Sequence, residues 1–289
     1  LYSGFPGWID QVRILNSIPN WAAGRLELEL DPLARTAFLR MEKDAAVELV
    51  IRNDTAESLT EGEINWVYTD QQGTQELAPL AAHFGARVMV PIDTRLRPVR
   101  YPLTVIARAK SGNKTWEARR ELNVVIVPRP LPNTMPVVMW GTGDLDRLQA
   151  IGFTHQLVNL ADFGRIWKEE KPTSAVGEEQ LSDRATMLNE YLARQVGAIA
   201  TLSPGSWVVR DAERQKRFQR IGRNGEPYKD PNPCGLFPEL TAFCENVGAS
   251  VSQTFKKFPA FQAALIHTEV RDSTNLCFHE HDRAAYRVK

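Results

Sequence analysis

A proline-rich stretch, Val127-Pro128-Arg129-Pro130-Leu131-Pro132, separates two parts of the chain that have different hydrophobic patterns. Each proline fixes its own φ and favours an extended conformation in the residue before it, so residues 128–134 are expected to form a stiff linker. The 289 residues also exceed the usual size of one domain. The chain is therefore predicted to be multi-domain.

The part before the linker has the pattern of an all-β domain. Short stretches rich in β-branched and aromatic residues alternate with turn residues, and no helical period of useful length interrupts them. This pattern predicts an antiparallel β-sandwich over residues 21–127. Gln71-Gln72-Gly73 and Ser111-Gly112-Asn113 are expected to be turns. The expected strands are residues 25–30, 36–41, 46–52, 63–69, 87–92, 103–109 and 115–127.

The part after the linker, residues 135–289, alternates expected strands with expected helices. The strands are residues 135–140, 155–160, 198–202 and 261–267. Residues 135–140 form a continuous apolar run, as a strand buried on both faces requires. Helical periods occupy residues 144–151, the stretch from Leu181 to Val196 and the stretch from about residue 236 to Phe258, and a long polar loop is expected before Gly235.

This alternation is typical of parallel β/α units. The stretch from Trp140 to Asp144 matches G-x-G but lacks the third glycine of a dinucleotide fingerprint, so no cofactor is expected. We therefore predict the first four β/α units of a (β/α)8 TIM barrel. Because a barrel has eight strands and open sheet edges are rarely tolerated, the remainder is expected from downstream sequence or from another chain.

Composition limits the classes of partner. The chain has 35 basic and 35 acidic residues, a balance that gives no reason to expect a nucleic-acid partner or an anionic membrane surface. No apolar run reaches 18 residues, so no membrane span is expected. The N-terminus has neither a methionine nor the pattern of a secretory signal, and we expect the chain to be a fragment or a processed product.

Candidate site residues follow from the barrel prediction, because barrel chemistry lies where strands end and βα loops begin. Glu269 follows the fourth strand, where partial desolvation can raise a carboxyl pKa and allow it to act as a general acid. The alternative is a structural Glu269 paired with Arg271. The candidates for substrate binding are Trp140, Asn159, Asp162, Trp207, His267, Arg271, Asp272 and His279.

Several of these binding candidates have a structural alternative. Trp140 and Trp207 offer flat apolar rings for sugar stacking, or they pack at a barrel rim. Asn159, Asp162 and Asp272 have side chains that bond sugar hydroxyls, although such residues more often cap helices or turns.

Metal-ligand residue types concentrate in Cys277-Phe278-His279-Glu280-His281-Asp282. The spacing does not match H-E-x-x-H, and the H-x-E at His267 lacks a following P-C-x-x-C. A polar βα loop with one or two substrate-facing histidines is expected there, and no metal site is assigned. Cys234, Cys244 and Cys277 form neither a CxxC pair nor an even disulfide framework, and we expect buried free thiols.

Phe258-Pro259-Ala260, the following apolar run and Thr268-Glu269 resemble clan A glycoside hydrolases of the family 42 type. Asn224-Gly225-Glu226-Pro227 and Asn232-Pro233-Cys234 resemble their third loop. The family usually has Asn where this chain has Thr268. The resemblance covers residues 135–289. It implies an oligo- or polysaccharide substrate, Glu269 as general acid/base, and a retaining mechanism with a nucleophile from a later strand.

Two further resemblances concern the N-terminal part. Residues 25–127 resemble the immunoglobulin-like or fibronectin-like modules that precede such barrels. The opening Gly7-Trp8-Ile9-Asp10-Gln11-Val12-Arg13-Ile14 resembles the final strand of laminin-G-like jelly rolls, so residues 1–20 are expected to be the remnant of such a domain. Together the resemblances imply a secreted protein, extracellular, periplasmic or on the cell surface.

Two other functions stay open from sequence. One is a non-catalytic carbohydrate-binding or adhesion protein, whose downstream sequence would lack a carboxylate after the seventh strand. The other is a metal-dependent hydrolase using His267, His279 and His281, which stoichiometric zinc would favour.

Overall fold

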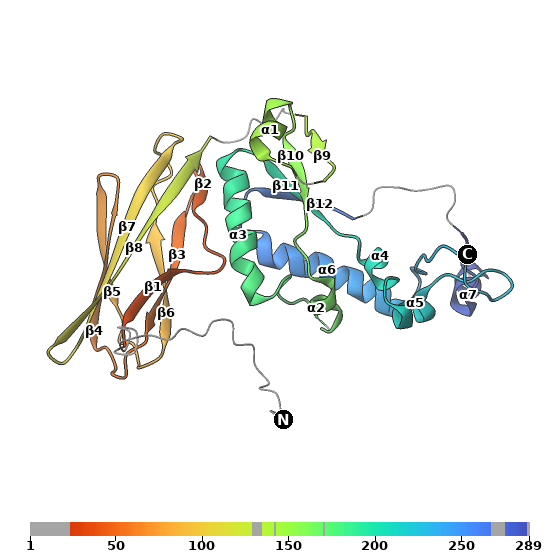
Figure 1. Ribbon diagram of the computed structural model, residues 1–289, viewed down its shortest axis with the longest axis horizontal. Coiled ribbons are helices and arrows are strands. Elements are labelled where there is room, and N and C mark those ends of the chain that lie inside the picture. Colours follow the sequence, from red (N-terminus) through yellow and green to blue (C-terminus); the bar gives the residue numbers. More distant parts are fainter. Residues whose placement is uncertain (1–23, 129–134, 142, 170, 267–274, 288–289) are drawn as a thin grey trace, which may run out of the picture. The chain divides into compact units, whose positions relative to one another are not determined.

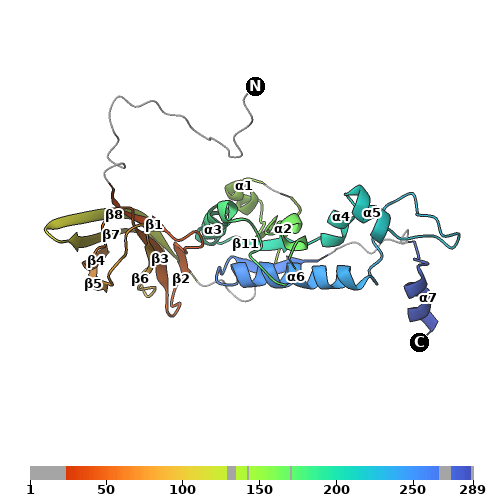
Figure 2. The ribbon, with the colours of Figure 1, turned by 90° about the horizontal axis from the view of Figure 1, so that it is seen from below.

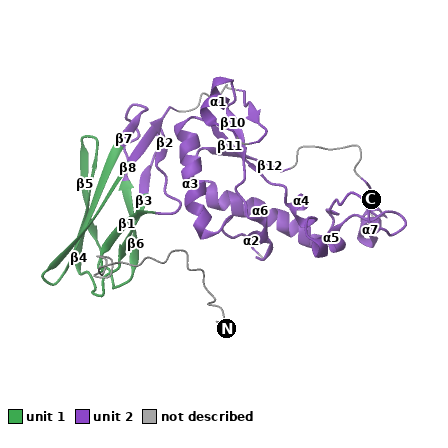
Figure 3. Ribbon diagram, in the orientation of Figure 1, with its two compact units in different colours: residues 1–30, 48–90, 102–122 green, residues 31–47, 91–101, 123–289 purple. Residues whose placement is uncertain are grey.

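A computed structural model describes residues 24–128, 135–141, 143–169, 171–266 and 275–287. The chain divides into two compact units (Figure 3). One comprises residues 1–30, 48–90 and 102–122, and the other comprises residues 31–47, 91–101 and 123–289. The second unit thus takes in stretches from both sides of the predicted linker.

Strands β1 to β8 precede the linker and form two sheets, in the orders β1-β3-β6 and β2-β8-β7-β4-β5. The pairings of β1 with β3 and of β4 with β5 and β7 are antiparallel, while β2 pairs with β8 in parallel. The antiparallel all-β part that the sequence predicts is present. The strands are β1 Leu26–Leu30, β2 Ala37–Leu39, β3 Ala46–Asn53, β4 Glu61–Tyr68, β5 Gln71–Leu77, β6 Gly85–Pro91, β7 Arg100–Ser111 and β8 Lys114–Val127.

The predicted turn at Gln71-Gln72-Gly73 is wrong, because these residues begin strand β5. The turn lies two residues earlier, at Thr69 and Asp70, and Thr69 has a φ of 59°. β5 is the edge strand of its sheet and most of its side chains are exposed, so its sequence shows no apolar alternation. Gly73 is needed there, since a Cβ at this position would lie 2.1 Å from the Trp66 ring of β4.

The C-terminal part is an α/β assembly around four parallel strands in the order β12-β11-β10-β9 (Figure 1). Strands that follow the chain order across a sheet are what a barrel half would show. The strands are β9 Val138–Met139, β10 His155–Val158, β11 Gly197–Thr201 and β12 Phe261–Leu265. The helices are α1 Leu145–Ala150, α2 Phe163–Trp167, α3 Glu178–Ala193, α4 Pro204–Val208, α5 Ala212–Phe218, α6 Pro238–Phe255 and α7 Glu280–Arg287.

Local sequence explains the boundaries of these helices. Asp144 caps α1 by accepting a hydrogen bond from the Arg147 N–H, and Gly152 follows the helix with a φ of 94°. Pro238 occupies the first turn of α6, where its missing N–H costs nothing. Leu240, Phe243, Val247, Val251 and Phe255 then recur at helical spacing and are buried.

The core of this part joins α3, α6 and the parallel sheet. Leu188 of α3, Val251 and Phe255 of α6, and Ala198 and Ala200 of β11 belong to one buried cluster. Figures 1 and 2 show α6 running from the neighbourhood of α4 and α5 to the sheet.

A buried asparagine fixes the N-terminal edge of this unit. Asn189 of α3 is 8% exposed, and its Oδ1 accepts hydrogen bonds from the backbone N–H groups of Thr36 and Ala37. Its Nδ2 donates to the Ala34 carbonyl. One side chain thus satisfies three backbone groups beside β2, which is why a polar residue is retained at a helical core position.

Two secondary-structure expectations differ from the structure. Residues 135–140 are predicted to be a strand buried on both faces, but only two of them form β9, and Met135, Val138 and Trp140 are exposed because β9 is a sheet edge. The expected polar loop before Gly235 contains α4 and α5, which are too short to show a clear period. No helix in the described part of the chain is long and apolar enough to cross a bilayer.

Candidate metal centre

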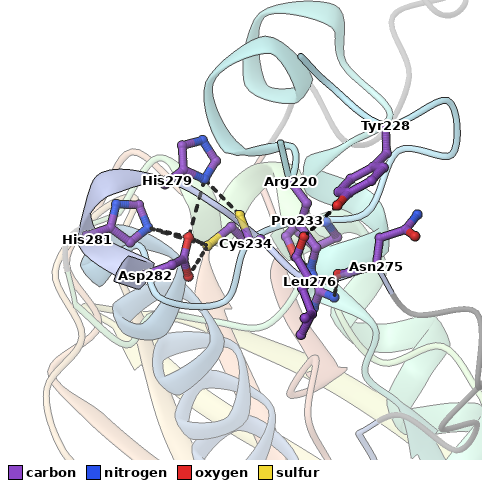
Figure 4. Close-up of polar contacts among 10 residues, drawn as sticks. Arg220, Tyr228, Pro233, Cys234, Asn275, Leu276, His279, His281 and Asp282 are labelled. Carbon is purple, nitrogen blue, oxygen red and sulfur yellow. Dashed lines mark hydrogen bonds and ion pairs between the residues drawn. The ribbon is translucent and has the colours of Figure 1, made fainter. Parts of the chain in front are cut away.

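Four side chains with metal-ligand chemistry meet at one point: Cys234, His279, His281 and Asp282 (Figure 4). One ligand atom from each lies within 4.8 Å of all the others. The Cys234 Sγ is 3.4 Å from His281 Nε2 and 3.3 Å from Asp282 Oδ1. The Asp282 Oδ2 is 3.6 Å from both His279 Nδ1 and His281 Nε2. We call these four residues the Cys-His-Asp cluster.

The cluster joins two segments that are distant in sequence. Cys234 ends the loop after α5, where its N–H donates to the Phe218 carbonyl at 2.8 Å. His279 immediately precedes α7, and His281 and Asp282 lie in the first turn of α7. α6 and β12 lie between the two segments along the chain, so only the folded chain brings the ligands together.

Hydrogen bonds hold the two segments together beside the cluster (Figure 4). Arg220 donates from Nε to the Pro233 carbonyl at 3.0 Å and from Nη1 to the Asn275 carbonyl at 2.9 Å. The Tyr228 hydroxyl donates to the Leu276 carbonyl at 2.9 Å. These contacts position the backbone on both sides without using any of the cluster's own ligand atoms.

Aromatic rings enclose one side of the cluster. The His279 and His281 rings stack with centroids 5.1 Å apart and an interplanar angle of 8°. Phe237 meets both edge-on, at 5.1 Å and 4.5 Å, and packs in turn on Phe218. The two imidazoles are therefore held in fixed orientations by apolar neighbours, a common way to preorganise metal ligands.

Burial shifts the pKa of two residues of the cluster, Cys234 and His279. Cys234 is 1% exposed, and desolvation raises the pKa of its thiol to about 12. Burial also lowers the pKa of His279, and the neighbouring His281 lowers it further. At neutral pH the His279 imidazole is therefore uncharged with a lone pair to offer, while Cys234 carries a proton that a metal must displace.

A second thiol lies next to the cluster. The Cys277 Sγ is 2.9 Å from His279 Nδ1. Cys277 also contributes to the raised pKa of the Cys234 thiol. Cys277 is half-buried, whereas Cys234 is buried, and Cys244, on α6, is exposed. All three cysteines are free thiols, as the sequence predicts, but only Cys234 is buried.

The donor set and its spacing fit a zinc-like ion. Thiolate and imidazole together are the ligands that Zn²⁺ takes in proteins. Tetrahedral bonds of about 2.0–2.3 Å separate the ligand atoms of such a site by roughly 3.3–3.8 Å. With Asp282 Oδ2 as the carboxylate ligand, four of the six ligand-atom separations are 3.4 to 3.6 Å and fall in this range, and the other two are at most 4.8 Å. Four protein ligands leave no open position, which is the arrangement of a structural site.

Four of the site residues predicted from sequence lie outside the described residues. These are Glu269, His267, Arg271 and Asp272. The structure describes the chain up to Ile266, the residue after β12, and again from Asn275. The predicted catalytic carboxylate therefore follows the carboxyl end of β12 in the sequence, where a barrel carries its chemistry.

Three of the described candidates have structural partners. The Asp162 carboxylate accepts from the Arg165 N–H and caps α2. The Asn159 Oδ1 accepts from the Ala161 N–H in a turn. Trp207 packs against Trp167 and Phe243, with ring centroids 6.0 and 5.6 Å away. Asp162 thus caps a helix and Asn159 stabilises a turn, which are the structural alternatives to sugar binding.

Trp140 and His279 differ from those three. Trp140 is 67% exposed at the end of β9 and presents its ring to the surroundings. His279, a predicted substrate contact, is part of the cluster instead. Cys234 was missed as its partner because it lies far upstream of α7. The only sequence feature that pointed to Cys234 was its prediction as a free thiol.

Comparisons with known proteins add little. No family model and no curated protein matches the chain. Among solved structures, a β-glucuronidase of Bacteroides uniformis is 9% identical with a TM-score of 0.36, and the exo-chitosanase CsxA of Amycolatopsis orientalis is 11% identical with a TM-score of 0.34. These alignments cover 83% and 84% of this chain but 27% and 28% of those chains.

A shorter match concerns a CARDB domain from Pyrococcus furiosus. It is 10% identical, has a TM-score of 0.27, and covers 36% of this chain and 89% of that domain. Likenesses at these TM-scores carry no functional conclusion for this chain.

Proposed function

We propose that the chain binds one zinc-class divalent ion through Cys234, His279, His281 and Asp282, and that the ion has a structural role. The convergence of four ligand atoms within 4.8 Å, from two segments separated by α6 and β12, supports this proposal. The ion would link the loop after α5 to the start of α7 and so stabilise the end of the β/α part.

Metal analysis tests the proposal. Protein loaded with Zn²⁺ and dialysed is expected to retain one equivalent per chain, and Cys234→Ser to retain much less. Cys244→Ser is the matched control, because Cys244 is an exposed thiol outside the cluster and should keep full occupancy. His281→Gln gives a second loss variant, should Cys234→Ser fail to fold. Full zinc retention by both cluster variants would reject the site.

The second proposed function is carbohydrate hydrolysis by a complete (β/α)8 barrel of which this chain supplies the first four strands. The sequential parallel order of β9 to β12 supports it, together with the family 42 resemblance around Glu269. β12 is a sheet edge, and an apolar cavity of about 500 Å³ lies between it and α6, lined in part by Val251, Phe261 and Ala264. Further β/α units would cover this edge.

In this second proposal Glu269 protonates the leaving oxygen, and a carboxylate from a later strand attacks the sugar. The substrate is an oligo- or polysaccharide, and the protein acts outside the cytoplasm. The alternative of a metal-dependent hydrolase is less favoured, because four protein ligands at the cluster leave no site for a reactive water.

The test uses the complete protein and Glu269→Gln. Loss of the general acid is expected to slow hydrolysis of natural glycosides by about 10²–10⁴-fold. Aryl glycosides with good leaving groups need less protonation, so their cleavage should fall less. Glu280→Gln, at an exposed glutamate, is the matched control and should keep full activity. Unchanged turnover of both substrate types by Glu269→Gln would reject the role.

A further inference from the structure

Cys277 is not needed to complete the proposed zinc site, yet its thiol lies against that site. Four other residues already supply four ligand atoms that lie within 4.8 Å of one another. The Cys277 Sγ lies 2.9 Å from Nδ1 of His279, which belongs to the same cluster as Cys234. The oxidisable thiol of Cys277 therefore lies beside a site that contains a buried thiol ligand.

We propose that Cys277 makes the zinc site redox-sensitive by forming a disulfide with Cys234 that removes one ligand and releases the ion. This inference rests on the proposed zinc site and extends it to the regulation of that site. Both thiols lie beside the His279 ring: the Cys277 Sγ is 2.9 Å from its Nδ1, and the Cys234 Sγ lies within 4.8 Å of its ligand nitrogen. Both are free thiols in this structure. Cys277 is the half-exposed thiol of the pair and so is the one that an oxidant reaches first.

The chemistry balances with hydrogen peroxide as the oxidant. The Cys277 sulfur attacks the peroxide, the O–O bond breaks, and a sulfenic acid and water form. The Cys234 sulfur then attacks the sulfenic sulfur, the S–O bond breaks, and the disulfide and a second water form. Each chain loses two protons and two electrons, and one hydrogen peroxide is reduced to two waters.

Zinc should oppose this reaction. A coordinated Cys234 thiolate is tied to the ion, so the loaded site has to loosen before the disulfide closes. Once formed, the disulfide takes away the only sulfur ligand of the cluster, and the remaining imidazoles and carboxylate bind zinc more weakly. A dithiol reductant should restore the thiols and with them zinc binding.

The experiment treats zinc-loaded chain with hydrogen peroxide and follows zinc release with a chromophoric chelator, together with peptide mass mapping. We expect release of one zinc per chain, a Cys234–Cys277 crosslinked peptide with a mass loss of about two units, and reversal by a dithiol. Cys277→Ala is expected to bind zinc but to release it much more slowly under peroxide. Cys244→Ser should behave like the wild type.

The outcomes separate this inference from the zinc proposal. If the wild type binds zinc but oxidation gives no Cys234–Cys277 peptide, the redox inference is overturned while the zinc site stands. If no zinc binds at all, the zinc proposal fails, and mass mapping of the peroxide-treated, zinc-free chain then decides whether the two thiols pair. Equal release rates for Cys277→Ala and wild type would also overturn the inference.

Discussion

The Cys234 sulfur lies 3.4 Å from Nε2 of His281, although the two residues are 47 positions apart along the chain. Neither residue belongs to a local metal-binding motif, so their chemistry depends on the fold that joins them. That dependence makes the pair sensitive both to protonation and to any change that separates the two segments.

Zinc affinity is expected to fall as pH falls. Cys234 has a pKa raised to about 12 by burial, so it is protonated at neutral pH and must lose its proton to coordinate. One displaced proton weakens binding about tenfold for each unit by which pH is lowered. Chelator competition at about pH 8 and about pH 7 measures the difference. Equal affinities at the two pH values would contradict a thiolate ligand at this position.

Removal of the Asn189 side chain should destabilise the fold. Asn189→Ala leaves the N–H groups of Thr36 and Ala37 and the Ala34 carbonyl without their present partner. Unsatisfied groups of this kind cost about 1–3 kcal/mol when buried, so the free energy of unfolding should drop by about 2–4 kcal/mol. Chemical denaturation measures this change in the free energy of unfolding.

Asn65→Ala is the matched control for this change. The Asn65 side chain also makes hydrogen bonds, but both are exposed to solvent. Its removal should therefore change the stability by less than about 0.5 kcal/mol. Equal effects of the two variants would show that burial of the Asn189 bonds is not what stabilises this region.

Sequence patterns were sufficient where periodicity is local. The run of α/β elements from Leu145 to Leu265 follows from helical and strand periods that most of these elements carry within themselves. The sequence did not predict β5, because the side chains of an exposed edge strand do not alternate between apolar and polar. The sequence did not predict the hydrogen bonds of Asn189, because its backbone partners lie more than 150 residues upstream.

The candidate site was less predictable than the fold for the same physical reason. His279 and His281 could be named from composition, but their partner Cys234 lies beyond α6 and β12. Local spacing cannot show which distant thiol a histidine meets. Moreover, His281 and Asp282 lie in the first turn of a polar helix with no buried residue, so no apolar core residues mark α7 in the sequence.

Two glycine-to-alanine substitutions should change the free energy of unfolding in opposite directions. Gly73→Ala places a Cβ 2.1 Å from the Trp66 ring, which must move, and overpacking of this kind costs about 1–3 kcal/mol. Gly248 lies inside α6, and a Cβ added there would meet no atom within 4 Å beyond the helix's own backbone, so Gly248→Ala should stabilise by up to about 1 kcal/mol. Thermal unfolding of both variants checks the prediction. A loss of stability in both would contradict it.

Substitutions of the two predicted sugar-stacking tryptophans should have different effects on stability. Trp207 packs among Phe163, Trp167 and Phe243, and the Arg214 guanidinium lies 3.9 Å from its ring centroid. Trp207→Ala should therefore lower the free energy of unfolding by about 2–4 kcal/mol.

Trp140 is 67% exposed, so Trp140→Ala should change stability by less than about 0.5 kcal/mol. If Trp140 stacks on sugar, this variant loses affinity for an oligosaccharide in the complete protein, because the large apolar surface of the indole ring is removed. Denaturation curves and oligosaccharide titrations of both variants provide the readouts. Unchanged oligosaccharide affinity in Trp140→Ala would leave the ring without a role in binding and would remove the exposed one of the two tryptophans from the predicted substrate site.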